Sequence, residues 1–177
     1  MSQKTKWAVD PTHTEIGFKV KHMMFTNVSG KIAKYDATVE TDGDEFNNAV
    51  VEFSADADSI TTANADRDAH LLSPDFFDTT KFPKLSFNAA SFRKTNDADF
   101  ELTGNLTLHG ITKPIELAVE FGGLMKDPWG NIKAAFNING KINRKDFGLT
   151  WNAALETGGV LVSDEVKVIA EIQLIKQ

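Results

Sequence analysis

The four histidines are the residues of this sequence best suited to chemistry, because an imidazole can bind a metal or move a proton near neutral pH. They stand at positions 13, 22, 70 and 109. No two of them have the strand spacing of two residues or the helix spacing of four that places two ligands on one face. The spacing therefore predicts no metal site. A metal-dependent or hydrolytic enzyme that uses His22 or His70 is an alternative that requires the fold to bring them together.

Nucleophilic and cofactor chemistry has no signature in this sequence. The chain contains no cysteine, which excludes thiolate catalysis, cysteine-bound metals and disulfides. It also lacks a Gly-x-Ser-x-Gly elbow, a Walker motif and a glycine-rich dinucleotide fingerprint. We therefore predict that the protein is not an enzyme, has no catalytic residue and uses no cofactor.

Three charged or titratable side chains, Arg67, Asp68 and His70, lie close together in a segment of a different kind. Residues 64–72 include several good helix formers and no β-branched side chain. The three side chains are candidates for polar contacts to the head group of a ligand. The alternative is an ion pair between Arg67 and Asp68 that fixes a loop.

Most other segments show a period-two alternation of apolar and polar residues, which predicts β-strands with one apolar face. In the first of them, Phe18, Val20 and His22 share a face, opposite Lys19 and Lys21. The pattern returns around residues 35–39, 49–55, 85–89, 100–108, 115–121, 132–142 and 166–174. Closing about eight antiparallel strands into a barrel buries these faces and removes the sheet edges. The sequence thus predicts an all-β, eight-stranded antiparallel barrel, with a two-sheet sandwich as the alternative.

The helical segment is an insertion among the strands. After a first helix over residues 64–72, Ser73-Pro74-Asp75 predicts the start of a second short helix, with Ser73 as its cap. The apolar side of the insertion consists of Leu71, Leu72, Phe76 and Phe77. Such an insertion can cover one end of the barrel, either as a permanent plug or as a gate that admits a ligand.

The chain has 13 phenylalanines and one tyrosine, which indicates a large apolar interior, because Phe needs only dry volume when it is buried. That interior is either fully packed, as in a structural or stress-response barrel, or it holds an apolar ligand. For the second case we predict that the ligand contacts Phe18, Val20, His22, Phe53, Arg67, His70, Phe76, Phe77, Phe87, Leu106 and Phe136.

Short motifs occur in a fixed order along the chain. They include Trp7–His13, Phe18–His22, Val28–Gly30, Arg67–Leu71, Asp75–Asp78, Phe82-Pro83, Gly104–Pro114 and Asn143–Gly148. The ordered set resembles the YceI-like family, also called polyisoprenoid-binding or lipocalin-like, over essentially the whole chain. The resemblance implies an extended, lipocalin-like eight-stranded antiparallel barrel. It also implies that the interior binds, stores or carries a polyisoprenoid or quinone-type lipid.

Chain length, net charge and the first residues bear on the number of domains, the partners and the cellular location. A chain of 177 residues with no shift in composition predicts one domain over residues 1–177. A net charge of -6 argues against nucleic acid and against an anionic membrane surface as partners. Transient membrane contact and a homodimer both stay open. The first residues contain no apolar run, which predicts a cytoplasmic location, or a periplasmic one if a leader has been removed.

Overall fold

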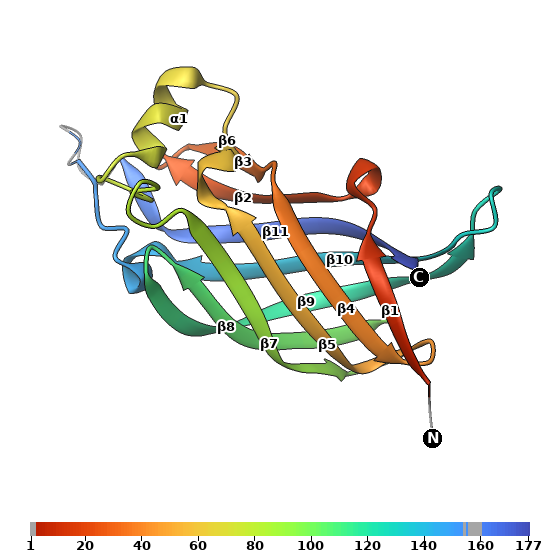
Figure 1. Ribbon diagram of the computed structural model, residues 1–177. Helices are drawn as coiled ribbons and strands as arrows, with labels where there is room; N and C mark the ends of the chain where they lie inside the picture. Colours follow the sequence, from red (N-terminus) through yellow and green to blue (C-terminus); the bar gives the residue numbers. More distant parts are fainter. Residues whose placement is uncertain (1–2, 154, 156–160) are drawn as a thin grey trace.

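The computed structural model describes residues 3–153, 155 and 161–177, and one antiparallel sheet closes on itself within it (Figure 1). The strands are β1 (Lys4–Val9), β2 (Glu15–His22), β3 (Thr26–Ile32), β4 (Tyr35–Asp42), β5 (Glu45–Asp56), β6 (Ile60–Thr61), β7 (Lys84–Lys94), β8 (Asp99–Leu108), β9 (Ile111–Lys126), β10 (Ile132–Asn143) and β11 (Val162–Lys176). The ring runs β1-β4-β5-β7-β8-β9-β10-β11, and β11 pairs with β1 to close it. The predicted eight-stranded antiparallel barrel is confirmed, and the two-sheet sandwich is wrong.

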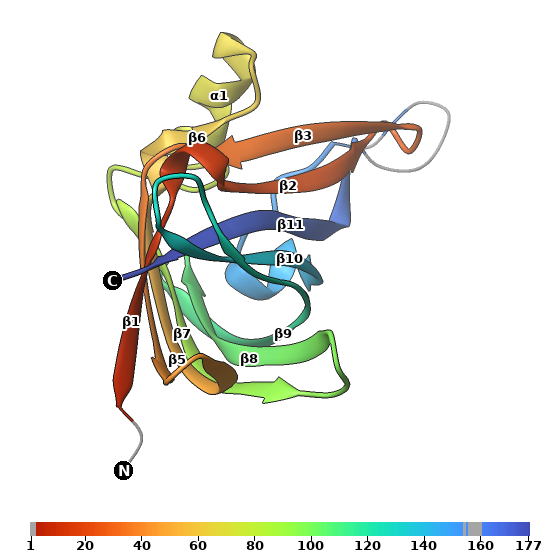
Figure 2. The same cartoon turned by 90° about the vertical axis from the view of Figure 1, so that its right-hand side faces the viewer.

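The three remaining strands prolong the wall of the barrel. β11 is 15 residues long, and it pairs with β1 near its C-terminal end and with β2 along the rest of its length. β3 pairs with β2 on one side and with the short β6 on the other. The β2–β3 hairpin projects from one side of the molecule (Figure 2). β1 and β2 therefore share one position in the wall, and β4 and β3 share the next.

The wall has a seam at the place where β1 gives way to β2 in one position and β4 gives way to β3 in the next. Pairing of β1 with β4 ends at Ala8 and Thr38, and pairing of β2 with β3 begins only at Gly17 and Lys31. Between these pairs, no backbone hydrogen bond joins the two positions in the described part of the chain. A surface groove lies over the seam, and it shares with the barrel interior the apolar residues Val9, Ile16, Ile32 and Ala37.

The described residues form one α-helix, α1 (Ala65–Leu72), and three 3-10 turns, η1 (Pro11–His13), η2 (Ala57–Ser59) and η3 (Arg144–Phe147). Asn64 caps α1 by accepting a hydrogen bond from the Arg67 N–H. The second helix predicted at Pro74 is wrong. Ser73 is extended and ends α1, and its carbonyl then accepts from the N–H groups of Phe76 and Asp78, so the chain continues as tight turns.

Glycines in two strands make room for aromatic rings inside the barrel. Gly30 of β3 stands opposite Phe18 of β2, and a Cβ at Gly30 would overlap the Phe18 ring. A Cβ at Gly104 would likewise come within 2.7 Å of the Phe87 ring. Both rings can therefore approach the backbone of the neighbouring strand closely.

Candidate ligand-binding cavity

A cavity of about 400 Å³ lies inside the barrel, which is in the size range of small-molecule sites. Apolar side chains from strands all around the ring line it, and many of them are only half-buried because they face this space. The alternative of a fully packed interior is therefore wrong. The period-two pattern of β2 is the local cause, since it turns Phe18, Val20 and His22 inward and leaves Lys19 exposed.

The structure places every residue that the sequence predicts for a ligand site in the lining of this one cavity. The residues are Phe18, Val20, His22, Phe53, Arg67, His70, Phe76, Phe77, Phe87, Leu106 and Phe136. They come from β2, β5, α1, the turns after α1, β7, β8 and β10. That a ligand contacts them stays a prediction.

An aromatic cluster closes one end of the cavity. The Phe46 ring lies at its centre, with centroid distances of 4.9 Å to Trp7, 5.4 Å to Phe121 and 5.0 Å to Phe136. Phe92 joins the cluster by an edge-on contact to Phe136 at 6.3 Å. These rings are packed against one another and belong to one buried apolar cluster, so they fill this end of the barrel.

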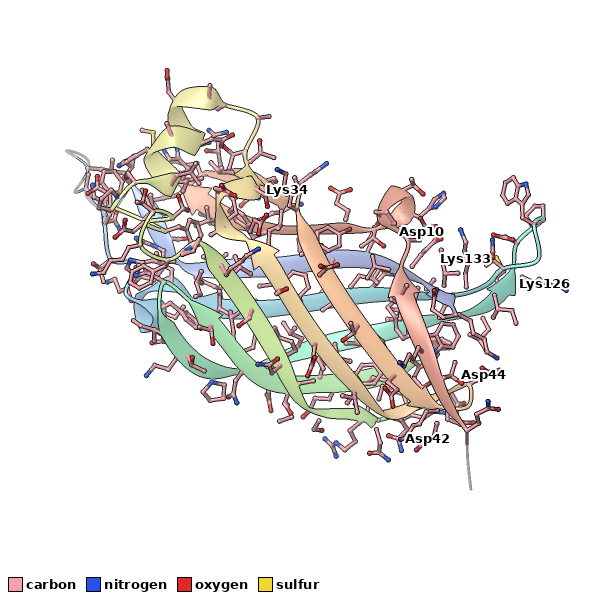
Figure 3. The ribbon with its side chains drawn as sticks, viewed as in Figure 1. Asp10, Lys34, Asp42, Asp44, Lys126 and Lys133 are labelled. Carbon is pink, nitrogen blue, oxygen red and sulfur yellow. The ribbon has the colours of Figure 1, made fainter. Side chains whose placement is uncertain are left out.

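An ionic cluster braces the same end (Figure 3). The buried Asp10 carboxylate accepts a hydrogen bond from Lys133 Nζ at 2.8 Å and contacts His13 Nδ1 at 2.9 Å. The hydrogen bond from Lys133 holds the pKa of Asp10 well below its ordinary value, although burial works in the opposite direction. The cluster ties β10 to the turn that follows β1.

Three aromatic rings cover the other end, which we call the mouth. The His70 ring lies 5.0 Å from Phe76 and 4.7 Å from Trp151, and Phe76 lies 5.2 Å from Trp151. His70 Nε2 also contacts Asp75 Oδ2 at 2.9 Å. These rings join α1 and the turns after it to the segment that precedes β11, so the lid over the mouth has two separate parts.

The polar part of the cavity lining gathers at the mouth. His22 ends β2, Arg67 and His70 lie on α1, and Arg144 lies on η3. α1 and the end of β2 lie at the same end of the barrel in Figure 1. The cavity is therefore apolar along its length and polar at one end, which suits an amphipathic ligand with one head group.

Arg67 and Asp68 fix a loop, but not through the expected ion pair. Within the described residues the two side chains do not form a salt bridge with each other; both bind Thr62 instead. Arg67 Nε donates to Thr62 Oγ1 at 2.7 Å, and Asp68 Oδ1 accepts from the Thr62 N–H at 2.8 Å. Burial alone would raise the pKa of Asp68, but the hydrogen bonds from Thr62 and Thr61 lower it below its ordinary value. These contacts hold α1 against the end of β6.

Arg144 and Trp151 also line the cavity, and neither was predicted from the sequence as a site residue. Arg144 is buried, and its guanidinium donates to the carbonyls of Leu149, Trp151, Val162 and Ser163. Burial lowers the pKa of Arg144. The motif Asn143–Gly148 was a signal for Arg144. Trp151 lies in a stretch without period-two alternation, so no pattern indicated its direction.

Metal ligation has no cluster to support it in the part of the chain that the structure describes. No group of three or more His, Cys, Asp or Glu side chains converges among those residues. His22 and His70 both line the cavity, yet no acid joins them as a third ligand there. Among the described helices, none is long and apolar enough to cross a membrane.

Comparisons with known proteins agree with this architecture. Residues 7–174 match the model of the YceI-like domain. A UPF0312 protein of Staphylococcus aureus strain N315 is 35% identical over 170 residues, which is 96% of each chain. The crystal structure of a Campylobacter jejuni YCEI protein has a TM-score of 0.76 at 33% identity, covering 95% of this chain and 96% of that one. A polyisoprenoid binding domain from Saccharophagus degradans shares the fold, with a TM-score of 0.67 at 13% identity over 97% of this chain and 98% of that one.

Proposed function

The chain belongs to the YceI-like domain family, and from that premise we propose that its barrel binds a long apolar lipid of the polyisoprenoid or quinone type and stores or carries it. The observation that carries the proposal is the cavity, which is apolar along its length and polar only at the mouth. The structural neighbour from Saccharophagus degradans, described as a polyisoprenoid binding domain, supports the same ligand class.

In the proposed complex, the tail lies along the barrel and its end meets the aromatic cluster around Phe46. The head group stays at the mouth, where His22, Arg67 and His70 offer hydrogen bonds. Arg67 already donates to Thr62, so an acceptor on the head group competes with that contact. The proposed function includes no catalytic step.

The energetics favour a carrier or store over an irreversible sink. Burying one methylene group gains about 0.8 kcal/mol relative to water. A tail of about ten methylene groups therefore gains roughly 8 kcal/mol, before the entropy cost of ordering the tail is subtracted. A lipid that leaves a bilayer gains far less, because its tail was already out of water. Exchange between bilayer and barrel is therefore nearly balanced.

Native mass spectrometry of the protein purified from its own host, followed by organic extraction, tests the proposal. We expect a bound mass that is released into the solvent and carries an isoprenoid tail. Protein that stays empty after incubation with a polyprenol or a ubiquinone in detergent would refute the proposed function.

A matched pair of variants assigns the lipid to the cavity. Val20 lines the cavity, whereas Val50 lies exposed on β5. We expect Val20→Trp to reduce the bound lipid, because the indole fills part of the space, and Val50→Trp to leave it unchanged. Equal binding by both variants would place the lipid outside the cavity.

A further inference from the structure

The turn between β2 and β3 exposes three consecutive apolar side chains. Met23, Met24 and Phe25 are 48%, 53% and 92% exposed. A run of three exposed apolar residues is unfavourable in water unless the surface has an apolar partner. We call these three residues the tip.

The backbone of the tip is also unfavourable for its residues. Met23 and Met24 have φ values of 52° and 68°, the left-handed region that hairpin turns normally fill with Gly or Asn. Side chains with a Cβ are disfavoured there. The turn thus combines a disfavoured backbone with exposed apolar side chains, two features that folding alone does not explain.

The tip is attached directly to the mouth of the cavity. The Met23 N–H donates to the Leu161 carbonyl at 2.8 Å, and both Leu161 and His22 line the cavity. The hydroxyl of Thr26 donates to the His22 carbonyl at 3.1 Å and stiffens the base of the turn. Whatever binds the tip therefore lies next to the opening of the lipid site.

Lysines stand just behind the tip. Lys19 and Lys21 precede it on β2, and Lys167 of β11 pairs in register with Lys19. All three are exposed, and among the described ion pairs none involves them. The nearby acids of β11, Asp164 and Glu165, are paired with other lysines. The three lysines therefore place positive charge behind the tip, although the whole chain carries a net charge of -6. At about 3.3 Å per residue, Lys21 and Lys19 lie roughly 7 and 13 Å behind Met23. A segment whose apolar side chains enter a bilayer by about 5–10 Å would bring such lysines to the lipid head groups.

We propose that the tip inserts into the surface of an anionic membrane, with the lysines on the lipid phosphates, and places the mouth of the barrel at the bilayer. The inference rests on the proposed lipid-binding function, because it supplies the route by which the tail passes without crossing water. A protein partner would need a contact area on the order of 1,000 Å². Three side chains on a narrow hairpin suit a bilayer better, since insertion needs only a few apolar groups with basic neighbours. At this site the positive charge of the lysines thus outweighs the net charge of -6, which by itself argues against binding to an anionic membrane.

Vesicle flotation with the full-length protein tests the inference. We expect the wild type to bind phosphatidylcholine vesicles that contain phosphatidylglycerol, and to bind pure phosphatidylcholine vesicles weakly. Replacing Met23, Met24 and Phe25 together by Ser should lower the bound fraction by about tenfold or more, because the inserted apolar area is lost. The pair Lys19→Gln and Lys167→Gln should weaken binding to the anionic vesicles and remove part of its salt dependence.

The opposite end of the barrel provides the control. The β9–β10 hairpin, marked by Lys126 in Figure 3, also exposes apolar side chains, and they are Leu124, Met125 and Trp129. Replacing these three by Ser removes comparable apolar surface away from the mouth and should leave vesicle binding unchanged. An equal loss in both triple variants, or no binding of the wild type to anionic vesicles, would overturn the inference.

Two further measurements separate the possible failures. The tip variant should still take up a polyprenol from detergent micelles as the wild type does, because the tip does not line the cavity. Loss of vesicle binding with normal uptake from micelles supports the inference, whereas no uptake by any form refutes the proposed function itself.

Analytical ultracentrifugation shows whether the tip joins two copies of the chain. A dimer that the tip variant abolishes, with vesicle binding unchanged, would overturn the membrane assignment.

Discussion

Arg144 holds the mouth of the barrel together at the level of a single side chain. Its guanidinium satisfies backbone carbonyls on both sides of the segment between η3 and β11, among them Leu149 and Val162. A Lys cannot replace this planar fork of donors. The lid of the cavity therefore depends on a residue that lines the cavity and whose guanidinium is held by backbone carbonyls.

We expect Arg144→Met to lower the free energy of unfolding by about 3 kcal/mol or more, because four buried or part-buried carbonyls lose their donor. Arg144→Lys should recover little of it. Urea unfolding followed by circular dichroism measures the effect. The control is Arg93→Met, since Arg93 is exposed and has one contact of 3.3 Å to Glu101; its cost should stay below about 1 kcal/mol. A cost for Arg144→Met as small as that of the control would contradict the role of Arg144.

Asp10 makes stability depend on pH at the closed end. Its folded-state pKa is depressed, chiefly by Lys133, so its contribution is present above the unfolded pKa of about 4 and is lost as pH falls below that value. We expect Asp10→Asn to cost about 1–3 kcal/mol at pH 7 and to reduce the loss of stability below pH 4. Unfolding at a series of pH values measures both effects, with the exposed Asp97→Asn as control. An unchanged pH dependence in Asp10→Asn would refute this assignment.

For single residues, the sequence predicted side-chain direction best in strands, where successive side chains alternate between the two faces. Alternation on β2 placed Phe18, Val20 and His22 in the lining without any knowledge of their neighbours. Trp151 was missed because an irregular segment has no period, so its direction depends on the bonds that Arg144 makes to the backbone.

At the element scale, paired strands set how much space the aromatic rings leave. Phe18 lies over Gly30, and Gly30→Ala would place a methyl group against its ring. We expect Gly30→Ala to cost about 1–3 kcal/mol and to push the ring into the cavity, which reduces lipid uptake. Unfolding and native mass spectrometry measure the two effects. In Gly122→Ala on β9 the new Cβ meets nothing closer than 3.4 Å, so that control should keep both stability and uptake. Normal uptake by Gly30→Ala would mean that the ring moves elsewhere.

The lid consists of α1, the turns after it and the segment with Trp151. Phe76 lines the cavity and contacts both other rings of the mouth, whereas Phe82 belongs to the same connection but does not line the cavity. We expect Phe76→Ala and Phe82→Ala each to cost a few kcal/mol, on the order of 2–4. Only Phe76→Ala should speed the release of bound lipid to empty vesicles. Equal release rates would mean that Phe76 does not limit the opening.

The helical insertion also shows where a local pattern fails. The helix expected over residues 64–72 forms as α1, one residue shorter because Asn64 caps it, and this cap bond needs only neighbours in sequence. The signal at Ser73-Pro74-Asp75 was equally local, but the Phe77 N–H bonds back to the Leu71 carbonyl and the turns fold onto α1 instead. Burial of Phe76 at the mouth is a tertiary gain that outweighs a short helix.

For the whole molecule, a ligand that binds only the folded barrel stabilises it. At a lipid concentration of a hundred times Kd the gain is about 2.7 kcal/mol. For a domain of this size that raises Tm by roughly 5–10 °C. We expect delipidated protein to melt lower than lipid-loaded protein by this amount, measured by thermal unfolding followed by circular dichroism. Val20→Trp should show little of the shift and Val50→Trp all of it. No shift in the wild type on loading would contradict a site inside the barrel.

The barrel as a whole was predictable because alternation in about eight segments, combined with the need to cover sheet edges, leaves few solutions. The division of two wall positions between two strands each was not predictable. One position is shared by β1 and β2, and the next by β4 and β3. Each division depends on pairing with β11 and β5, which are far away in the sequence, and pairing of distant strands depends on packing that a single segment does not encode.

The seam between these strands affects how thick a lipid tail the barrel can hold. A fully laddered barrel has a fixed circumference, because the number of strands and their stagger determine it. Here Ala8 and Gly17 mark the ends of a stretch that no ladder bond ties to the neighbouring position. The wall can part along this stretch without breaking a backbone pair. We therefore expect one sequence to accept tails of different thickness, branched or saturated, by changing its circumference at a single place.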